Sequence, residues 1–302
     1  MVDITRLDTE QRNPNTGNID KLGTLEMVKL INNEDQKVAL SVEAVLPAIA
    51  CAVDAIYERL RDGGRLIYVG AGTSGRLGLL DAAECPPTFS VEHDMVIALL
   101  AGGPAAFMKA IEGAEDSREL GANDLIATGF TAKDALVGIA ASGRTPYVIG
   151  ALEYARSVGG FTIGLSCTQN SEIAQVADVD ISPQPGPEVI TGSTRMKSGT
   201  AQKMVLNMLT TAAMIKLGKT YGNLMVDLKA TNEKLVCRAA NIVCTATGVS
   251  EERAKEELAK SEFSAKNAIL MILANVDYAT SREALNLHDG RIYMALDYLS
   301  KR

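Results

Sequence analysis

Apolar side chains in the N-terminal part of the chain recur at helical spacing. Residues 19–31 carry them at intervals of three and four, and residues 36–61 continue this pattern across Pro47. A proline inside a helical pattern removes a backbone donor, so we expect a kink there, and Gly63 and Gly64 should end the second helix. The pattern predicts an N-terminal helical segment.

From residue 65 onward the pattern changes to short apolar runs that alternate with helix-like stretches. The apolar runs cover residues 65–69, 95–100, 134–140, 161–166 and 179–182. The helix-like stretches cover residues 74–83, 105–112, 145–158 and 171–176. Strands that are apolar throughout are typical of a parallel sheet with helices on both faces. The sequence therefore predicts an α/β fold, a three-layer doubly wound domain with a five-stranded parallel sheet.

The strand pattern disappears in the C-terminal part of the chain. A proline-rich connection at residues 183–187 leads to a long helical stretch at residues 200–217, and from residue 230 onward every apolar pattern is helical. We expect an N-terminal helical segment over residues 1–50, an α/β domain over residues 51–225 and a small C-terminal helical subdomain over residues 226–302.

Composition and charge exclude several classes of protein. With 30 basic and 37 acidic residues the net charge is −7, and aromatic residues make up 4% without any Trp, so we expect no nucleic-acid-binding surface. No apolar run approaches the roughly 18 residues of a membrane span, and the first residues are polar and unlike a signal peptide. We therefore expect a cytoplasmic protein that binds neither nucleic acid nor membrane.

Cysteine and histidine are too few and too scattered for several kinds of site. The five cysteines form no CxxC pair, and the two histidines, His93 and His288, lie in unrelated contexts. A disulfide framework, a zinc site and a Ser-His-Asp triad are therefore not expected. We expect no bound metal, and chemistry that depends on carboxylates, hydroxyls, backbone amides and cationic side chains.

The clearest local motif follows the first apolar run. Residues 70–75 read GAGTSG and open a helix-like stretch, in the form of the dinucleotide-binding motif GxGxxG. A dinucleotide site also needs an acidic residue at the end of the second strand, where residues 99–103 read LLAGG. The loop suits a single phosphate better, because its amides and the helix dipole favour an anion and Thr73 and Ser74 add hydroxyl donors. A plain glycine-rich turn is the alternative.

Two further hydroxyl-rich loops repeat this composition. Residues 141–146 (ASGRTP) follow the third apolar run, and residues 191–200 (TGSTRMKSGT) precede the long helix. The candidate phosphate-binding residues of the three loops are Gly72, Thr73, Ser74, Ser142, Arg144, Ser193, Thr194, Arg195 and Lys197. Because ligands of open parallel sheets bind at the carboxyl ends of the strands, three such loops indicate a small phosphorylated ligand, most simply a sugar phosphate. For each of the three cations, exposure to solvent or a structural salt bridge is an equally good explanation.

Two glutamates lie close to these motifs in the sequence. Glu84 precedes a double proline, which we expect to end its helix and to leave the side chain near the first phosphate loop. Glu115 follows a glycine break after the second apolar run, and its neighbours Asp116 and Ser117 fit a helix N-cap. Either glutamate suits acid–base catalysis, although a carboxylate near a helix end more often caps the helix or is solvated.

Several blocks of the sequence resemble one bacterial enzyme family. They cover residues 69–78, 81–88, 112–119, 138–147, 191–202 and 223–234. Together they are similar to the N-acetylmuramic acid 6-phosphate etherases, which recycle cell-wall amino sugars and have the sugar isomerase (SIS) fold. The similarity extends from about Asp20 to the C-terminus, and these motifs show no departure from the family pattern.

The resemblance implies cleavage of the D-lactyl ether of N-acetylmuramic acid 6-phosphate to N-acetylglucosamine 6-phosphate and D-lactate, by elimination and then hydration. It also implies a homodimer, no cofactor, and a SIS-type sugar-phosphate-binding domain at residues 51–225. By motif match, Glu84 is the general acid and Glu115 is the base. These roles agree with the chemistry, since one carboxylate must remove the proton beside the open-chain aldehyde while another, protonated, assists the departing lactyl oxygen.

Two other activities are compatible with the same loops. A ketose–aldose phosphate isomerase of this fold shares the proton abstraction but has no leaving group to protonate. A non-catalytic sugar-phosphate sensor, similar to glucokinase regulatory protein, needs the phosphate loops but not paired catalytic carboxylates. Both glutamates are present, and we expect no additional regulatory domain within 302 residues. The etherase activity is therefore the preferred interpretation.

Overall fold

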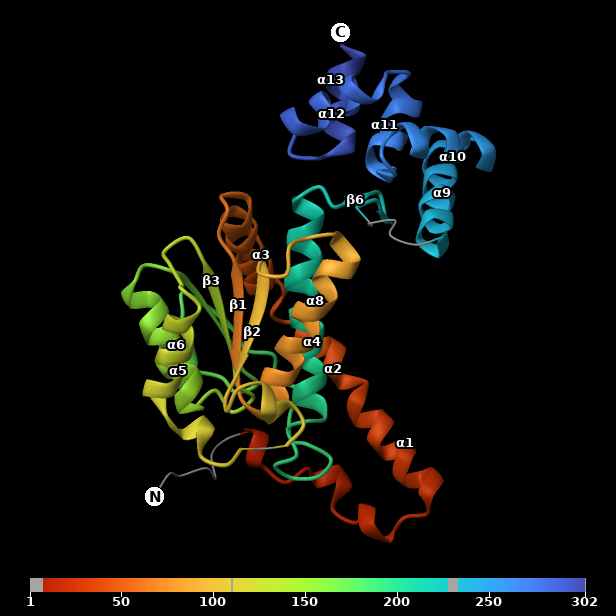
Figure 1. Ribbon diagram of the computed structural model, residues 1–302. Coiled ribbons are helices and arrows are strands. Elements are labelled where there is room, and N and C mark those ends of the chain that lie inside the picture. Colours follow the sequence, from red (N-terminus) through yellow and green to blue (C-terminus); the bar gives the residue numbers. More distant parts are fainter. Residues whose placement is uncertain (1–7, 110, 228–232, 302) are drawn as a thin grey trace. The chain divides into compact units, whose positions relative to one another are not determined.

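The N-terminal part of the chain is helical, as the sequence predicts. The computed structural model describes residues 8–109, 111–227 and 233–301 (Figure 1). Three 3₁₀ turns come first, at Asp8–Glu10 (η1), Pro14–Thr16 (η2) and Ile19–Lys21 (η3), and three helices follow, at Thr24–Asp35 (α1), Lys37–Glu43 (α2) and Leu46–Arg61 (α3). The kink expected at Pro47 is a complete break, because Pro47 lies in the first turn of α3, where a missing backbone donor costs no hydrogen bond.

The apolar side chains of α3 pack against the sheet. Within the described residues, no single helix is both long and apolar enough to cross a bilayer, and residues 24–43 and 46–61 meet the length and composition requirement only as a pair bent by 60°. In α3 the buried apolar residues are Ile49, Ala52, Val53, Ile56 and Leu60. They recur at helical spacing, so that one stripe of α3 faces the core.

A five-stranded parallel sheet forms the centre of the fold, which confirms the prediction. Its strands are Leu66–Gly70 (β1), Val96–Leu100 (β2), Ala135–Ile139 (β3), Phe161–Leu165 (β4) and Val179–Ile181 (β5), in the order β2-β1-β3-β4-β5. Gly70 is in register with Leu100 on one side and with Ile139 on the other, so three strands end at the same level. The strand order reverses between β1 and β3, which is where ligands bind in open parallel sheets.

Helices cover both faces of the sheet. They are Gly72–Phe89 (α4), Arg118–Ala127 (α5), Pro146–Ser157 (α6), Glu172–Val176 (α7) and Lys197–Lys216 (α8), with short 3₁₀ turns at Pro104–Phe107 (η4) and Ala114–Asp116 (η5). In Figure 1, α5 and α6 lie on one side of the sheet and α4 and α8 on the other. Ile67 packs in the cluster formed with α5 and α6, whereas the Tyr68 hydroxyl donates to Asp81 of α4 at 2.8 Å. Successive strand residues point to opposite faces of the sheet, so β1 contributes side chains to the packing on both faces.

One predicted helix does not form as expected. Residues 105–112 were expected to be helical, but the structure has only the 3₁₀ turn Pro104–Phe107 there, and residue 110 lies outside the described residues. Gly102 and Gly103 both adopt positive φ immediately before this turn. Such a conformation favours a tight turn over a regular helix start.

The C-terminal region has its own core. A two-stranded hairpin, Thr220–Tyr221 (β6) and Leu224–Met225 (β7), precedes the helices Glu233–Thr247 (α9), Glu251–Lys260 (α10), Ala265–Ala274 (α11), Tyr278–Leu287 (α12) and Ile292–Ser300 (α13). Val243, Leu258 and Ile269 are fully buried in a cluster of this region. By its contacts the chain forms two compact units, residues 1–83 with 94–210, and residues 84–93 with 211–302. The predicted domain boundaries at residues 50 and 225 stay a prediction.

Candidate active site

A polar cavity of about 330 Å³ opens at the carboxyl ends of β1 and β3. Its walls include residues of all three hydroxyl-rich loops. The candidate residues that line it are Gly72, Thr73, Ser74, Ser142, Arg144, Thr194 and Glu115. The cavity lies at the switch point of the strand order, so the structure brings most of the predicted site together where a ligand is expected.

The first loop turns directly from β1 into α4. The turn is tight, because a Cβ atom on Gly75 would lie 2.5 Å from the Gly70 carbonyl oxygen, and only glycine permits this approach. The first backbone N–H groups of α4 have no partner within the helix, and its dipole favours an anion at this end. The Ser74 side chain is buried, and its hydroxyl donates to Oε1 of Gln202 at 2.9 Å. Thr73 is only half-buried, so its hydroxyl is the better placed of the two for a ligand.

The second loop contributes one cation to the cavity. Arg144 is half-buried and its Nε donates to Oε1 of Glu172 at 3.0 Å. This ion pair holds the side chain in place while Arg144 also lines the cavity beside Ser142. A guanidinium is a planar cation whose N–H donors match the geometry of a phosphate.

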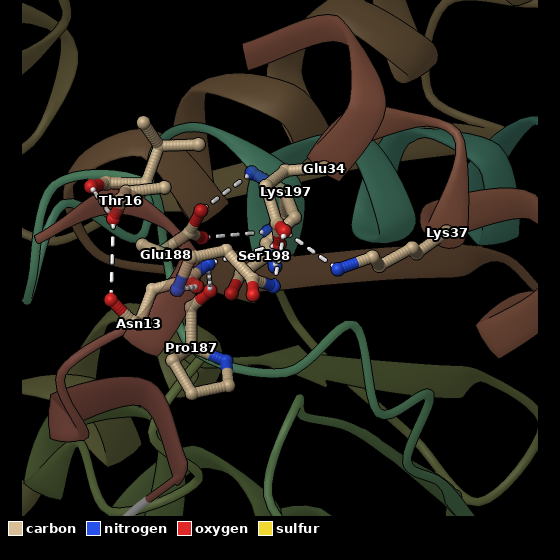
Figure 2. A network of polar contacts seen from close by, with 10 residues as sticks. Asn13, Thr16, Glu34, Lys37, Pro187, Glu188, Lys197 and Ser198 are labelled. Carbon is tan, nitrogen blue, oxygen red and sulfur yellow. Dashed lines mark hydrogen bonds and ion pairs between the residues drawn. The ribbon is translucent and has the colours of Figure 1, made fainter. Parts of the chain in front are cut away.

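Lys197 does not line the cavity and instead forms a structural ion pair. Its side chain is 1% exposed, and Nζ donates to Oε2 of Glu34 at 2.9 Å (Figure 2). The structural salt bridge, which the sequence left open for each loop cation, is the observed arrangement here. Of its neighbours in the third loop, Thr194 lines the cavity, while Ser193 and Arg195 do not belong to its lining.

Two carboxylates organise the beginning of α8. The fully buried Glu188 accepts hydrogen bonds from the backbone N–H groups of Lys197 and Ser198, each at 2.9 Å, and so caps the helix (Figure 2). Burial raises the pKa of Glu34, but hydrogen bonds from Lys37, Lys197 and two asparagines outweigh it and lower this pKa to about 2. Glu34 is therefore ionised at neutral pH, and the pair with Lys197 is a buried ion pair.

Glu115 lies where the sequence predicts a site residue. It is in η5 and lines the same cavity as the phosphate loops. Ser117 is the N-cap of α5, and its hydroxyl oxygen accepts the N–H of Leu120 at 3.1 Å, which confirms its predicted role. Asp116, predicted as a capping residue, lines the cavity beside Glu115 instead.

The helix that carries Glu84 does not end at the double proline, and this corrects the sequence prediction. The double proline was expected to end the helix, but α4 continues through Pro86 and Pro87 to Phe89. The φ of proline is helical, so prolines in the last turns remove hydrogen bonds without unwinding the chain. Glu84 follows Gly72 by twelve residues in α4, a rise of about 18 Å along the helix. Its side chain is exposed and does not line the described cavity.

The structure adds one titratable residue that the sequence did not indicate. Glu10 of η1 lines the cavity, although it precedes β1 by more than fifty residues. No local motif marks Glu10, because its position depends on contacts between segments that are distant in sequence. Among the described residues, no group of three His, Cys, Asp or Glu side chains could hold a metal ion.

The sequence matches three domain families. Residues 48–156 match the N-terminal SIS domain of glucokinase regulatory protein, residues 123–212 match the SIS domain, and residues 222–286 match the C-terminal lid domain of glucokinase regulatory protein. The two SIS matches cover the sheet and its loops, in agreement with the observed fold.

Similarity to complete relatives is much more extensive. The chain is 59% identical over 295 residues to the N-acetylmuramic acid 6-phosphate etherase of Aliivibrio fischeri, covering 98% of each chain. It is 54% identical over 301 residues to the etherase of the same name from Clostridium beijerinckii, covering 100% of this chain and 99% of that one. The chain belongs to the N-acetylmuramic acid 6-phosphate etherase family.

The solved structures agree at the level of the fold. A phosphoheptose isomerase from Francisella tularensis superposes with a TM-score of 0.50 at 19% sequence identity, covering 64% of this chain and all of the isomerase. An identity this low supports the common fold and carries no statement about the reaction.

Proposed function

We propose that the chain cleaves the D-lactyl ether of N-acetylmuramic acid 6-phosphate with water, giving N-acetylglucosamine 6-phosphate and D-lactate in amino-sugar recycling. The observation that carries the proposal is the meeting of Glu115 with three hydroxyl-rich loops in one cavity, in a chain of the etherase family. A cytoplasmic location belongs to the same proposal, because an anionic sugar phosphate does not cross a bilayer unaided.

The phosphate loops orient the substrate. The N–H groups of the first turn of α4, the Thr73 hydroxyl and the Arg144 guanidinium are donors on the cavity wall that suit a phosphate dianion. Ser142 and Thr194 add hydroxyls from the other two loops. Holding the phosphate fixes the sugar carbons relative to Glu115, and positioning of this kind supplies a large share of the rate.

Glu115 acts as the base of an elimination. Direct displacement of an unactivated ether is slow, because an alkoxide is a poor leaving group. In the open-chain sugar, the aldehyde acidifies the proton on the adjacent carbon, which bears the amide. Glu115 removes this proton, the C3–O bond to the lactyl group breaks, and a general acid protonates the departing oxygen. Water then adds to the unsaturated aldehyde by the reverse proton transfers.

We assign the general acid to Glu84 of a second copy of the chain. The helix rise separates Glu84 from Gly72 by about 18 Å, too far for one carboxylate to protonate an oxygen a few bonds from a phosphate held at Gly72. Leu80, one turn before Glu84 on α4, is 52% exposed and lines an apolar cavity of about 700 Å³ with Phe107. An exposed apolar surface is typical of an interface, and in the homodimer that we propose across this surface Glu84 completes the site of the neighbouring copy.

Complementation between two inactive variants tests this arrangement. We expect Glu84→Gln and Glu115→Gln homodimers to lack lactate release. A heterodimer of the two, purified by two affinity tags, should have one intact site and about half of the wild-type activity. An inactive heterodimer would show that both glutamates come from the same chain. The Glu84→Gln homodimer carrying both tags is the matched control.

Heavy-oxygen water tests the reaction itself. When N-acetylmuramic acid 6-phosphate is incubated with the enzyme in this solvent, elimination and hydration should place the label in the C3 hydroxyl of the sugar product. Mass spectrometry of both products measures where the label goes. Label in lactate would contradict cleavage on the sugar side of the ether, and an absence of lactate would contradict the activity.

A further inference from the structure

The cavity contains a carboxylate that the mechanism above does not use. Glu10, the last residue of η1, lines it together with Glu115 and Asp116. A carboxylate near a bound phosphate dianion weakens binding by repulsion, so its presence needs another explanation. Within the described ranges no side chain forms a hydrogen bond or ion pair with Glu10.

Buried contacts hold the N-terminal segment beside the third loop. Asn13 donates from Nδ2 to Oε2 of Glu34 at 2.9 Å and to the carbonyl of Pro187 at 3.1 Å (Figure 2). The Thr16 hydroxyl donates to the carbonyl of Val189 at 2.9 Å. Glu34 in turn pairs with the buried Lys197 at the start of α8. Because Glu10 precedes Asn13 by only three residues, these contacts fix its backbone at the cavity.

The third loop leaves space for the Glu10 carboxylate. A Cβ atom on Gly192 would lie 3.2 Å from Oε2 of Glu10, closer than most such contacts. Gly192 also has a φ of +76°, which other residues adopt only with strain. A larger residue at this position would therefore disturb both the loop and the carboxylate.

We propose that Glu10 opens the sugar ring, an inference that rests on the proposed function. The elimination needs the open-chain aldehyde, and Glu115 is committed to the proton on C2. Glu10 accepts the proton of the anomeric hydroxyl as the C1–O5 bond breaks and the C1=O1 bond forms, and it returns the same proton to O5. The step needs no co-reactant. Neither His93 nor His288, which could also transfer protons, lines the described cavity.

Anomerisation of the product measures ring opening separately from ether cleavage. We expect the wild type to accelerate the exchange between the α and β forms of N-acetylglucosamine 6-phosphate, observed by magnetisation-transfer NMR. Glu10→Gln should lose this acceleration and reduce lactate release by about 100-fold or more, while the affinity for the product, measured by calorimetry, should not fall, because the variant removes a negative charge near the phosphate. Glu10→Asp, which keeps the carboxylate, should retain part of the acceleration.

Asp116→Asn is the matched control, since Asp116 is the other unassigned carboxylate of the cavity, and it should retain the acceleration. The proposal is overturned if Glu10→Gln exchanges the anomers at the wild-type rate, or if Asp116→Asn loses the exchange while Glu10→Gln keeps it. A wild type that releases lactate without accelerating anomerisation also overturns it. A wild type that releases no lactate contradicts the proposed function instead, so the two failures are distinguishable.

Discussion

Replacing Glu115 by glutamine should abolish both proton exchange at C2 of the sugar and release of lactate. The amide keeps the shape of the side chain but accepts no proton, so the fall in kcat should be about 100-fold to 10,000-fold, the usual contribution of a positioned base. Sugar-phosphate affinity should change little, because the donors of the three loops remain. Deuterium uptake at C2, followed by NMR, and coupled detection of lactate measure the two steps.

Two further variants test the role of Glu115 separately from that of the general acid and provide a control. Glu84→Gln should keep deuterium uptake at C2 while losing lactate release, because the acid is needed only when the ether breaks. Glu119→Gln changes an exposed carboxylate in the first turn of α5, outside the described cavity, and should have wild-type activity. A Glu115→Gln enzyme that exchanges the C2 proton at the normal rate would contradict the assigned base.

The largest loss of stability should come from the buried ion pair. Lys197→Met leaves the Glu34 carboxylate in place without its most deeply buried partner, and removing one member of a buried pair costs about 3–5 kcal/mol. Urea unfolding at pH 7, followed by circular dichroism, measures this loss. In the double variant Glu34→Gln with Lys197→Met no unpaired charge is buried, so it should be more stable than Lys197→Met alone. A double variant whose loss is the sum of the two single losses would contradict the pairing.

The same pair predicts how stability depends on pH. The pKa of Glu34 is about 2 in the folded chain against 4.5 in the unfolded one, so protonation favours unfolding. The carboxylate stabilises the fold fully above pH 4.5, and this contribution, about 3 kcal/mol, is lost as the pH falls toward 2. Glu34→Gln should flatten this part of the stability profile. An unchanged slope in that variant would assign the acid sensitivity to other groups.

Local sequence patterns were sufficient to predict the architecture of the sheet. The five strands were predicted because the strands of a parallel sheet are buried on both faces and therefore consist of continuous apolar runs. The helices between them were predicted from their spacing, except at residues 105–112, where only a 3₁₀ turn forms. The loops at residues 70–75 and 141–146 were predicted as parts of one site for a related reason, since parallel strands place their carboxyl ends together.

The distribution of the charged residues depended on tertiary contacts. Lys197 has the residue type and loop position of a phosphate ligand, but α1 brings Glu34 against it and buries the pair. No local sequence motif marks Glu10. It lies at the cavity because hydrogen bonds from Asn13 and Thr16 hold its segment against residues 187–189. Local patterns also failed to predict that α4 continues past its double proline, and this continuation determines where Glu84 lies on the helix.

By itself, the sequence determined the sheet, the family and the loops that surround the cavity, because each of these depends on periodicity or on contiguous motifs. Only the tertiary structure decided which side chains face that cavity, since a long side chain is directed by neighbours from segments far away in the chain. Glu34 and Lys197 are 163 positions apart in the sequence, and their buried ion pair gives both charged side chains a structural role.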